Sequence, residues 1–332
     1  MDILGVLTAE LGVKRSQIEA AVKLIDEGNT IPFIARYRKE VTGSLNDEVL
    51  RNLDERLKYL RGLEDRKTQV LASIEDQGKL TADLKKKIEE AETMVAVEDL
   101  YLPFRPKRKT RASVALADTI LLQMTKEPIE TLAARYISEE KGVANVKAVI
   151  DGAKDILAER ISEVAKYRAY IRNVTKEEGF VVSEAKDEKT ESVYEMYYHH
   201  EELVRKCAGH RILALNRGEK EKILTVKIAA PEEKILRYLN KMVITRENAV
   251  TTPVLQEAIA DSYNRLIAPA IEREVRNLMT EKAEDGAIKI FGKNLEQLLM
   301  QPPIAGRVVL GWDPAFRTGC KLAVVDATGK VL

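Results

Sequence analysis

The sequence predicts a mainly α-helical protein that ends in a β-hairpin. Apolar residues recur at helical spacing over most of the 332 residues. Charged residues make up 32 % of the chain and aromatic residues only 5 %, which is typical of a helix-rich and strongly solvated protein. Near the end of the chain, two short β-rich runs flank a tight connection, and a turn follows the second run. We therefore expect a multi-helix body followed by a small antiparallel sheet.

The composition and net charge of the chain limit the classes of protein to which it can belong. The formal net charge is +1, so any nucleic-acid binding must depend on local basic patches and not on the field of the whole protein. Cys207 and Cys320 lie far apart, which favours a reducing compartment over a disulfide scaffold. No apolar run reaches membrane-spanning length, and the N-terminus lacks the layout of a signal peptide. We expect a cytoplasmic protein of two or three domains with no membrane partner.

The first two expected elements are short helices. An amphipathic helix over residues 3–10 is followed by a turn at residues 11–13, and Ser16 caps a second helix that extends to about Glu27. This order predicts a helix-turn-helix-like element. A purely structural helical hairpin is the alternative, because many such hairpins also carry a glycine in the turn.

A basic segment follows within residues 29–45, whose sequence is NTIPFIARYRKEVTGSL. Thr30 can cap a short helix with Pro32 in its first turn, and Gly43 ends the segment. Long cationic side chains next to aromatic ones suit contacts with phosphates. The candidate contacts here are Arg36, Arg38 and Lys39.

A long helix is expected over residues 45–77. Leucines at seven-residue spacing form its apolar stripe, but Glu64 and Lys67 interrupt the repeat, which favours helix-bundle packing over an extended coiled coil. Thr81 starts another helix, which extends to about Thr93.

A second basic segment, residues 101–111, contains two prolines and cannot be helix interior or central strand. Cationic side chains on a backbone stiffened by proline suit phosphate contacts, and simple solvated charge is the alternative reading. The candidate contacts here are Arg105, Lys107, Arg108, Lys109 and Arg111.

The middle of the chain is expected to be mostly helical. Two short helices lie within residues 113–137, and Asn145 caps a helix that extends to about Asn173. Residues 179–189 are polar and mark the first domain boundary. We expect the tyrosines and histidines of residues 190–200 on a helix face.

A helix over residues 209–219 then leads to an alternating strand over residues 223–229. Thr252 caps a long helix with an expected kink at Pro269 and an interruption near Gly286. The histidines and the cysteine between residues 199 and 210 fit no usual zinc spacing, so no metal site and no cofactor are expected.

The C-terminal residues carry the most chemically specific pattern. The apolar run 308–310 ends in Gly-Trp-Asp-Pro, which places Asp313 just past a strand and opposite an antiparallel partner. An RNase H-like sheet begins in this way, and its first carboxylate can hold a divalent cation. The alternative is that Asp313 only caps a turn.

Four blocks of the chain resemble the Tex family of bacterial transcription accessory proteins. The blocks are IPFIARYRKEVTGSL at 31–45, the Leu-Tyr-x-Pro-Phe stretch with its basic residues at 100–111, HRILALNRGE before the strand at 223–229, and Leu-Gly-x-Asp-Pro-x-x-Arg-Thr-Gly-x-Lys at 310–321. Ala315 stands where the family usually has glycine. The resemblance implies a helical N-terminal domain over 1–185, a helical connector with a short β segment over 186–305, and the incomplete start of a YqgF, or RNase H-like, domain over 306–332.

The resemblance also implies a function. It indicates a transcription-associated protein that binds RNA or DNA, weakly in this chain, because the family binds largely through domains that follow the YqgF domain. RNA polymerase or other transcription machinery is an expected protein partner. We expect no enzymatic activity, with Asp313 as a vestigial candidate, because two-metal chemistry needs several converging carboxylates. The alternatives are a protein-interaction scaffold and a metal-dependent RNase H-like nuclease.

Overall fold

The computed structural model describes residues 2–105, 111–137, 145–302, 304, 306–315 and 319–332, and for residues 111–113 it describes the backbone alone. The chain divides into two compact units, Met1–Gly179 with Ala229–Arg273, and Phe180–Ile228 with Glu274–Leu332. The prediction of a mainly helical protein with a C-terminal hairpin is confirmed.

The described part of the first unit is helical. Its elements are α1 (Ile3–Leu11), α2 (Arg15–Asp26), α3 (Ile31–Tyr37), α4 (Asp47–Asp76), α5 (Ala82–Glu90), α6 (Met94–Tyr101), the 3-10 turn η1 (Leu102–Phe104), α7 (Arg111–Leu121), α8 (Ile129–Ala134), α9 (Val146–Ser162), α10 (Ala165–Glu178), α12 (Glu232–Val243), α13 (Thr251–Asp261), the π-helical turn η5 (Ser262–Ile267) and the start of α14 (Ala268–Leu299).

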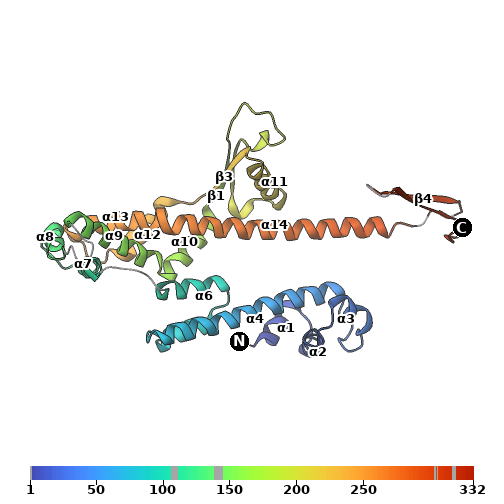
Figure 1. Cartoon of the computed structure of the whole chain (residues 1–332), viewed down its shortest axis with the longest axis horizontal. Helices are drawn as coiled ribbons and strands as arrows, with labels where there is room; N and C mark the ends of the chain where they lie inside the picture. The colour runs from blue at the N-terminus through green and yellow to red at the C-terminus, as the bar shows by residue number, and fades with distance from the viewer. Residues whose placement is uncertain (1, 106–110, 138–144, 303, 305, 316–318) are drawn as a thin grey trace. The chain divides into compact units, whose positions relative to one another are not determined.

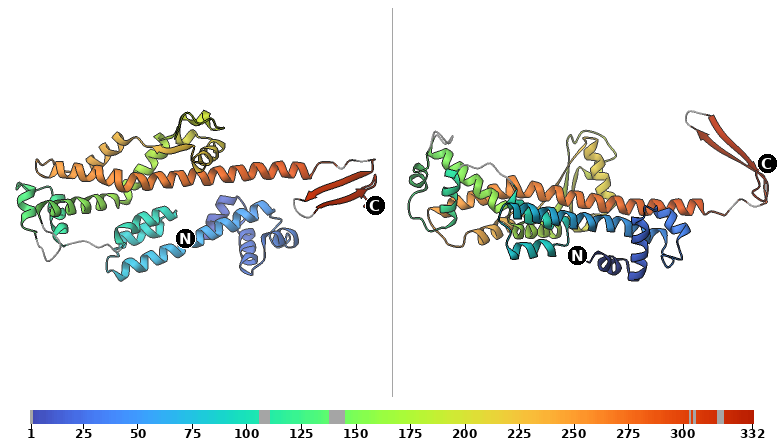
Figure 2. Two further views of the ribbon diagram at one scale, coloured as in Figure 1. Left: turned by 45° about the horizontal axis from the view of Figure 1, so that its top comes forward. Right: turned by 60° about the horizontal axis from the view of Figure 1, so that its bottom comes forward.

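Helix α4 organises the N-terminal part of this unit (Figures 1 and 2). The leucines of its first half, from Leu50 to Leu60, are buried against α1, α2 and α3. Its second half packs on α5 and α6 through Leu63, Val70 and Ile74. A further core cluster joins α7, α8, α9 and α13.

The polar interruption of the α4 repeat has a structural role. Lys67 is only 3 % exposed, and its ammonium group donates a 2.8 Å hydrogen bond to the carbonyl of Glu89 at the end of α5. Its Nζ also lies 2.9 Å from a carboxylate oxygen of Glu64. A buried lysine is tolerated because both contacts compensate its desolvation. The interruption therefore joins α4 to α5, in agreement with bundle packing.

Two of the predicted side-chain caps are confirmed, whereas Thr30 stands at the N-cap of α3 without a cap hydrogen bond. Thr81 accepts from the N–H of Leu84, and Asn145 accepts from the N–H of Ala148. The prediction that Ser16 caps the second helix is wrong. Helix α2 begins one residue earlier, and the Gln17 side chain accepts from the N–H of Lys14.

Two helices replace the single helix expected from Asn145 to Asn173. Helix α9 ends at Ser162, whose hydroxyl donates to the carbonyl of Glu159. Val164 then has φ −73° and ψ 107°, an extended conformation that a β-branched residue adopts readily, and α10 starts immediately after it.

The second unit contains a three-stranded sheet that the sequence analysis largely missed. Strand β1 (Phe180–Ala185) lies between β2 (His199–Leu203) and β3 (Leu224–Ala229), and it is antiparallel to β2. Only β3 was predicted. The expected polar boundary at 179–189 contains β1, and the expected helix face at 190–200 contains a 3-10 turn, Glu195–Tyr197, and the start of β2.

Arg276 of α14 anchors this sheet. Its guanidinium donates 2.8 Å hydrogen bonds to the carbonyl of Val226 on β3 and to the side chains of Asn216 and Glu219 on α11 (Gly209–Lys220). Gly209 permits close packing of α11, because a Cβ built there would lie 3.2 Å from the Cα of Ala283 on α14.

The expected irregularities of the long helix lie elsewhere than predicted. The helix does not break at Gly286, because α14 continues to Leu299. The irregular turn is η5, which ends two residues before Pro269. Proline lacks an N–H and disfavours the regular turn before it, which accounts for a widened turn at this place. Helix α13 begins at Thr251, one residue before the expected cap Thr252.

The C-terminal hairpin pairs β4 (Val309–Ala315) with β5 (Gly319–Val325). Trp312 lies opposite Leu322, and Asp313 lies opposite Lys321. The expected third strand is reduced to one bridge between Val325 and Val331. Among the described residues, no helix is both long and apolar enough to cross a membrane.

Candidate nucleic-acid interface

Helix α3 presents basic and aromatic side chains because its apolar residues Ile31, Ile34 and Ala35 pack against the core. Ile34 is fully buried against α1, α2 and α4, while Arg36 and Tyr37 on the same helix are exposed. Pro32 lies in the first turn, where its missing N–H costs no helical hydrogen bond.

The loop after α3 is held in one conformation by hydrogen bonds. Thr42 is fully buried, and its hydroxyl lies 3.3 Å from the carbonyl oxygen of Arg38 and 3.4 Å from that of Lys39. The Ser44 N–H donates to the Lys39 carbonyl at 2.7 Å. The Gln17 amide of α2 donates to the carbonyl of Gly43 at 2.8 Å. The backbone that carries the basic residues is therefore fixed before any ligand binds.

Four side chains of this segment form what we call the α3 ladder, a chain of contacts in the order Arg38, Phe33, Tyr37, Arg36. The guanidinium carbon of Arg38 lies 5.1 Å from the centroid of the Phe33 ring. The Phe33 and Tyr37 centroids are 5.3 Å apart, with planes tilted by 48°. The guanidinium carbon of Arg36 lies 5.9 Å from the Tyr37 centroid. The two arginine-to-ring distances lie within the range of cation–π contacts.

The cations of this segment remain available to an anionic ligand. Within the described part of the chain, no carboxylate lies at salt-bridge distance from Arg36, Arg38 or Lys39. Arg38 donates only to the neighbouring Tyr37 carbonyl, at 3.2 Å. All three side chains are exposed. The three predicted contacts on this segment thus lie together on one rigid stretch.

Arg105 is in a different environment. Its guanidinium is 2.5 Å from Glu98 on α6, and Glu98 also accepts a 2.6 Å bond from Arg66 on α4. The hydrogen bond from Arg66, helped by that from Arg105, lowers the pKa of Glu98 in spite of partial burial. Arg105 therefore forms part of a structural ion-pair cluster between α4 and α6.

The other residues predicted in that basic segment are less well defined. Lys107, Arg108 and Lys109 lie outside the described residues. The backbone of Arg111 begins α7. Their assignment as phosphate contacts stays a prediction.

Asp313 is exposed on β4, with Lys321 as its cross-strand neighbour on the same face. Asp326, the next carboxylate along the hairpin, accepts bonds from the hydroxyl and the N–H of Thr328, and this pairing lowers its pKa. Across the described ranges, no group of three or more His, Cys, Asp or Glu side chains is placed to hold a metal ion.

Two of the residues considered for zinc, His200 and Cys207, lie next to Glu202. Glu202 accepts a 2.6 Å bond from Arg211 and lies 3.5 Å from the Nε2 of His200. Burial and a hydrogen bond to Glu202 raise the pKa of Cys207 to about 12. A thiol that stays protonated is a poor metal ligand.

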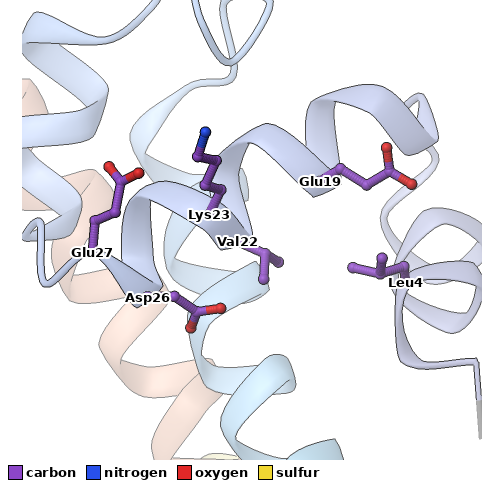
Figure 3. Close-up of a pocket in the computed structure, with 6 residues that line it drawn as sticks. All are labelled: Leu4, Glu19, Val22, Lys23, Asp26 and Glu27. Atoms are coloured by element: carbon purple, nitrogen blue, oxygen red, sulfur yellow. The ribbon is translucent and has the colours of Figure 1, made fainter.

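A surface hollow of about 410 Å³ lies beside α1 and α2 (Figure 3). Leu4 and Val22 point toward one another across it, and the charged residues around it are Glu19, Lys23, Asp26 and Glu27. Asp26 is paired with Arg61 at 2.7 Å, which lowers the pKa of Asp26. The acidic rim makes this hollow unsuitable for a phosphate.

The cations of α3 could be predicted from the sequence, but the residues that organise them were not predicted. Phe33 and Tyr37 are four residues apart, a spacing that places two rings on one helix face and could have revealed the ladder. Gln17 gave no comparable signal, since its hydrogen bond reaches a carbonyl 26 residues along the chain. The bonds of Thr42 are local, to carbonyls three and four residues earlier, but a threonine after a helix does not by itself indicate them.

Comparison with known proteins assigns most of the chain. A model of the Tex-like protein N-terminal domain matches residues 1–75, a Tex central region-like model matches residues 123–291, and a Tex protein YqgF-like domain model matches residues 307–332. The α3 ladder lies in the first match, whereas residues 101–111 lie between the first and the second.

Curated relatives align with nearly the whole chain. "Uncharacterized protein YdcI" of Bacillus subtilis is 48 % identical over 336 residues, which are 98 % of this chain and 47 % of the relative. "Transcriptional accessory protein Tex" of Neisseria gonorrhoeae is 39 % identical over 347 residues, covering 100 % of this chain and 45 % of the relative. Human "S1 RNA-binding domain-containing protein 1" is 29 % identical over 353 residues, covering 100 % and 35 %.

The chain thus spans less than half the length of these relatives. The central-region match alone covers more than half of the chain, and the two other models extend it to both ends. The chain belongs to the Tex family.

Proposed function

We propose that this chain is a nucleic-acid-binding part of a transcription accessory protein, and that α3 with its following loop contacts phosphates. Two relatives support the general role, one called a transcriptional accessory protein and the other named for an S1 RNA-binding domain. The observation that carries the proposal is the set of exposed cations without carboxylate partners on a rigid backbone, namely Arg36, Arg38 and Lys39.

Few phosphate contacts give weak and salt-sensitive binding. Each neutralised phosphate contributes about −0.9 to the slope of log K against log salt concentration for duplex DNA, and about −0.7 for single strands. Three contacts therefore predict a contribution of about −2 to −3 to the slope. Any contact made by the basic residues between 105 and 111 would add to this value.

The test is a salt titration of fluorescence anisotropy with labelled oligonucleotides. The triple variant Arg36→Gln, Arg38→Gln, Lys39→Gln should bind more weakly and show a slope smaller by about two to three. The matched control replaces Arg51, Lys58 and Lys87 with glutamine, since each of these cations is paired with an aspartate four residues earlier. An equal loss of slope in the control would show that only net charge matters and would reject the α3 site.

A protein-interaction scaffold is the second candidate. Large apolar side chains of α14 are exposed, among them Ile288, Phe291 and Leu298. The Neisseria relative is called a transcriptional accessory protein, and RNA polymerase or other transcription machinery stays the expected partner class. A pure scaffold predicts no salt-dependent affinity for any oligonucleotide, so the same titration separates the two functions.

We infer that the chain is not a nuclease, because Asp313 faces Lys321 and no second carboxylate of the described hairpin is free to share a cation with it. The measurement is cleavage of labelled single- and double-stranded substrates with Mg²⁺ or Mn²⁺. Turnover that disappears in Asp313→Ala would contradict this inference. The domain limits at 185 and 305 and the cytoplasmic location stay predictions from the sequence.

A further inference from the structure

The α3 ladder contains a second kind of group besides its cations. We propose that it is a binding site for single-stranded nucleic acid, in which an unpaired base stacks on Tyr37 while Arg36, Arg38 and Lys39 contact the adjoining phosphates. This inference rests on the proposed function and adds to it the class of nucleic acid that the site selects.

The exposure of Tyr37 is the first argument. Its side chain is 60 % exposed, and within the described residues its hydroxyl has no hydrogen-bond partner. Val41, four residues later, is 55 % exposed. A large aromatic ring that leaves the core, on a backbone fixed by Thr42 and Gln17, offers a preformed face to a flat ligand.

Two other tyrosines of the same unit, Tyr59 and Tyr101, have structural contacts that Tyr37 lacks among the described residues. Arg56 lies 4.9 Å from the Tyr59 ring, but Glu10 holds Arg56 through two 2.6 Å bonds, and the Tyr59 hydroxyl accepts from the N–H of Met94. The Tyr101 hydroxyl is 3.0 Å from the hydroxyl of Ser73. In the part of the chain that the structure describes, Tyr37 has neither a bonded hydroxyl nor arginines held by carboxylates.

The chemistry of the ladder favours unpaired bases. In a duplex, both faces of each base are covered by its neighbours, so a ring at the protein surface cannot stack on them. A single strand exposes these faces, and both aromatic rings and guanidinium planes accept them. No carboxylate among the described residues holds the guanidinium groups on Tyr37 and Phe33, so they can move to phosphates when a base takes their place.

The electrostatics of the segment agree with this ligand. Arg36, Arg38 and Lys39 contribute three positive charges and Glu40 one negative charge, which gives a net charge of +2 for residues 36–40. The aromatic residues are interleaved with these cations in the sequence FIARYRK. Interleaved rings and cations are the pattern of sites that bind single strands with little sequence preference.

The main test compares single-stranded and duplex oligonucleotides of the same length with Tyr37→Leu, Tyr37→Phe and the unmodified chain. The leucine variant keeps an apolar side chain but has no ring. It should lose about 5-fold to about 150-fold in single-strand affinity, the range for one stacked base, with an unchanged salt slope and little change in duplex affinity. The phenylalanine variant should bind as the unmodified chain does.

Tyr59→Leu is the matched control, because it removes a ring with a cation–π contact whose arginine is already held by a carboxylate. It should leave single-strand affinity unchanged. Circular dichroism melts establish that all variants fold. Single-strand affinity that survives in Tyr37→Leu, or that is lost equally in Tyr59→Leu, would overturn the inference.

A second measurement detects the stacking of a base on the side chain at position 37 directly. The chain has one tryptophan, Trp312, so a Tyr37→Trp substitution in a Trp312→Phe background reports only on the ladder. Single-stranded oligonucleotide should quench the fluorescence of the new indole, and an acidic peptide should not. Equal quenching by the peptide would overturn the inference.

The two proposals fail in distinguishable ways. If the triple cation variant loses salt slope while Tyr37→Leu binds normally, the phosphate site stands and base stacking is rejected. If neither variant changes binding, the α3 site itself is rejected.

Discussion

Two clusters of arginine and aromatic side chains in the first unit resemble each other in geometry but differ in what holds the arginines. In the α3 ladder, guanidinium carbons lie 5.1 and 5.9 Å from ring centroids, and no carboxylate of the described residues pairs with them. Around Tyr101, the corresponding distances for Arg66 and Arg105 are 5.4 and 5.9 Å. Both of those arginines are bonded to Glu98.

This comparison shows that a cation–π contact by itself does not indicate a binding site. The presence of a carboxylate partner distinguishes a structural arginine from one that can bind a ligand. A guanidinium bonded to a carboxylate has its charge compensated and its side chain fixed. The cluster around Tyr101 therefore connects helices, while the α3 ladder retains charge for a ligand. Variants that remove the carboxylates or the cations test this distinction.

The largest effect should come from a buried carboxylate that holds two arginines. Asp99 on α6 accepts from Arg168 at 2.6 Å and from Arg172 at 2.7 Å, and all three side chains are at most 13 % exposed. Asp99→Asn removes the anion that two buried arginines share, so the free energy of unfolding should fall by about 3–5 kcal/mol. Urea denaturation followed by circular dichroism measures it. A loss below about 1 kcal/mol would mean that the arginines find other partners.

The next-largest effect is a difference in the free energy of unfolding between two double variants that each remove two positive charges. Arg66→Gln with Arg105→Gln removes both partners of Glu98 and should lower the free energy of unfolding by about 1–3 kcal/mol. Arg36→Gln with Arg38→Gln should change it by less than about 0.5 kcal/mol, because those side chains hold no other element. Equal losses in the two denaturation experiments would remove the distinction between the clusters.

A smaller effect concerns pH. The bond from Arg66 lowers the pKa of Glu98 in the folded protein, so the folded state favours the carboxylate. Its contribution to stability is complete above the unfolded pKa of about 4.3 and is lost as the pH falls through the lower folded pKa. The Glu98→Gln variant lacks this term. Between about pH 5 and about pH 3, its melting temperature should therefore fall less than that of the unmodified chain.

Some elements of the fold could be predicted from the sequence alone, and others could not. The apolar periodicity of residues 45–77 was sufficient to predict α4, and the two β-rich runs on either side of the short 317–320 connection in the sequence were sufficient to predict the hairpin. Strand β1 was missed because Ser183 occupies a core position, where its hydroxyl bonds to the carbonyl of Tyr197. A buried hydroxyl interrupts the apolar alternation that signals a strand.

The candidate site was predicted only in part for a related reason. Charge patterns identified Arg36 and Arg105 equally well as phosphate contacts. What separates them is Glu98, which lies on a different element from Arg105 and pairs with it only because η1 turns the chain back toward α6. Such pairing depends on the fold, so a basic residue in a sequence cannot be assigned to binding or to structure without it.

The smallest effect tests a single charge of the ladder's segment. Lys39→Gln removes a cation that contacts neither a ring nor a carboxylate among the described residues, so folding should be unaffected. The salt slope of oligonucleotide binding should fall by about 0.7 to 0.9, the value for one phosphate. Lys58→Gln, whose ammonium group pairs with Asp54 at 2.7 Å, is the control and should leave the slope unchanged. If both substitutions lower the slope equally, the absence of a carboxylate partner does not mark a phosphate contact in this protein.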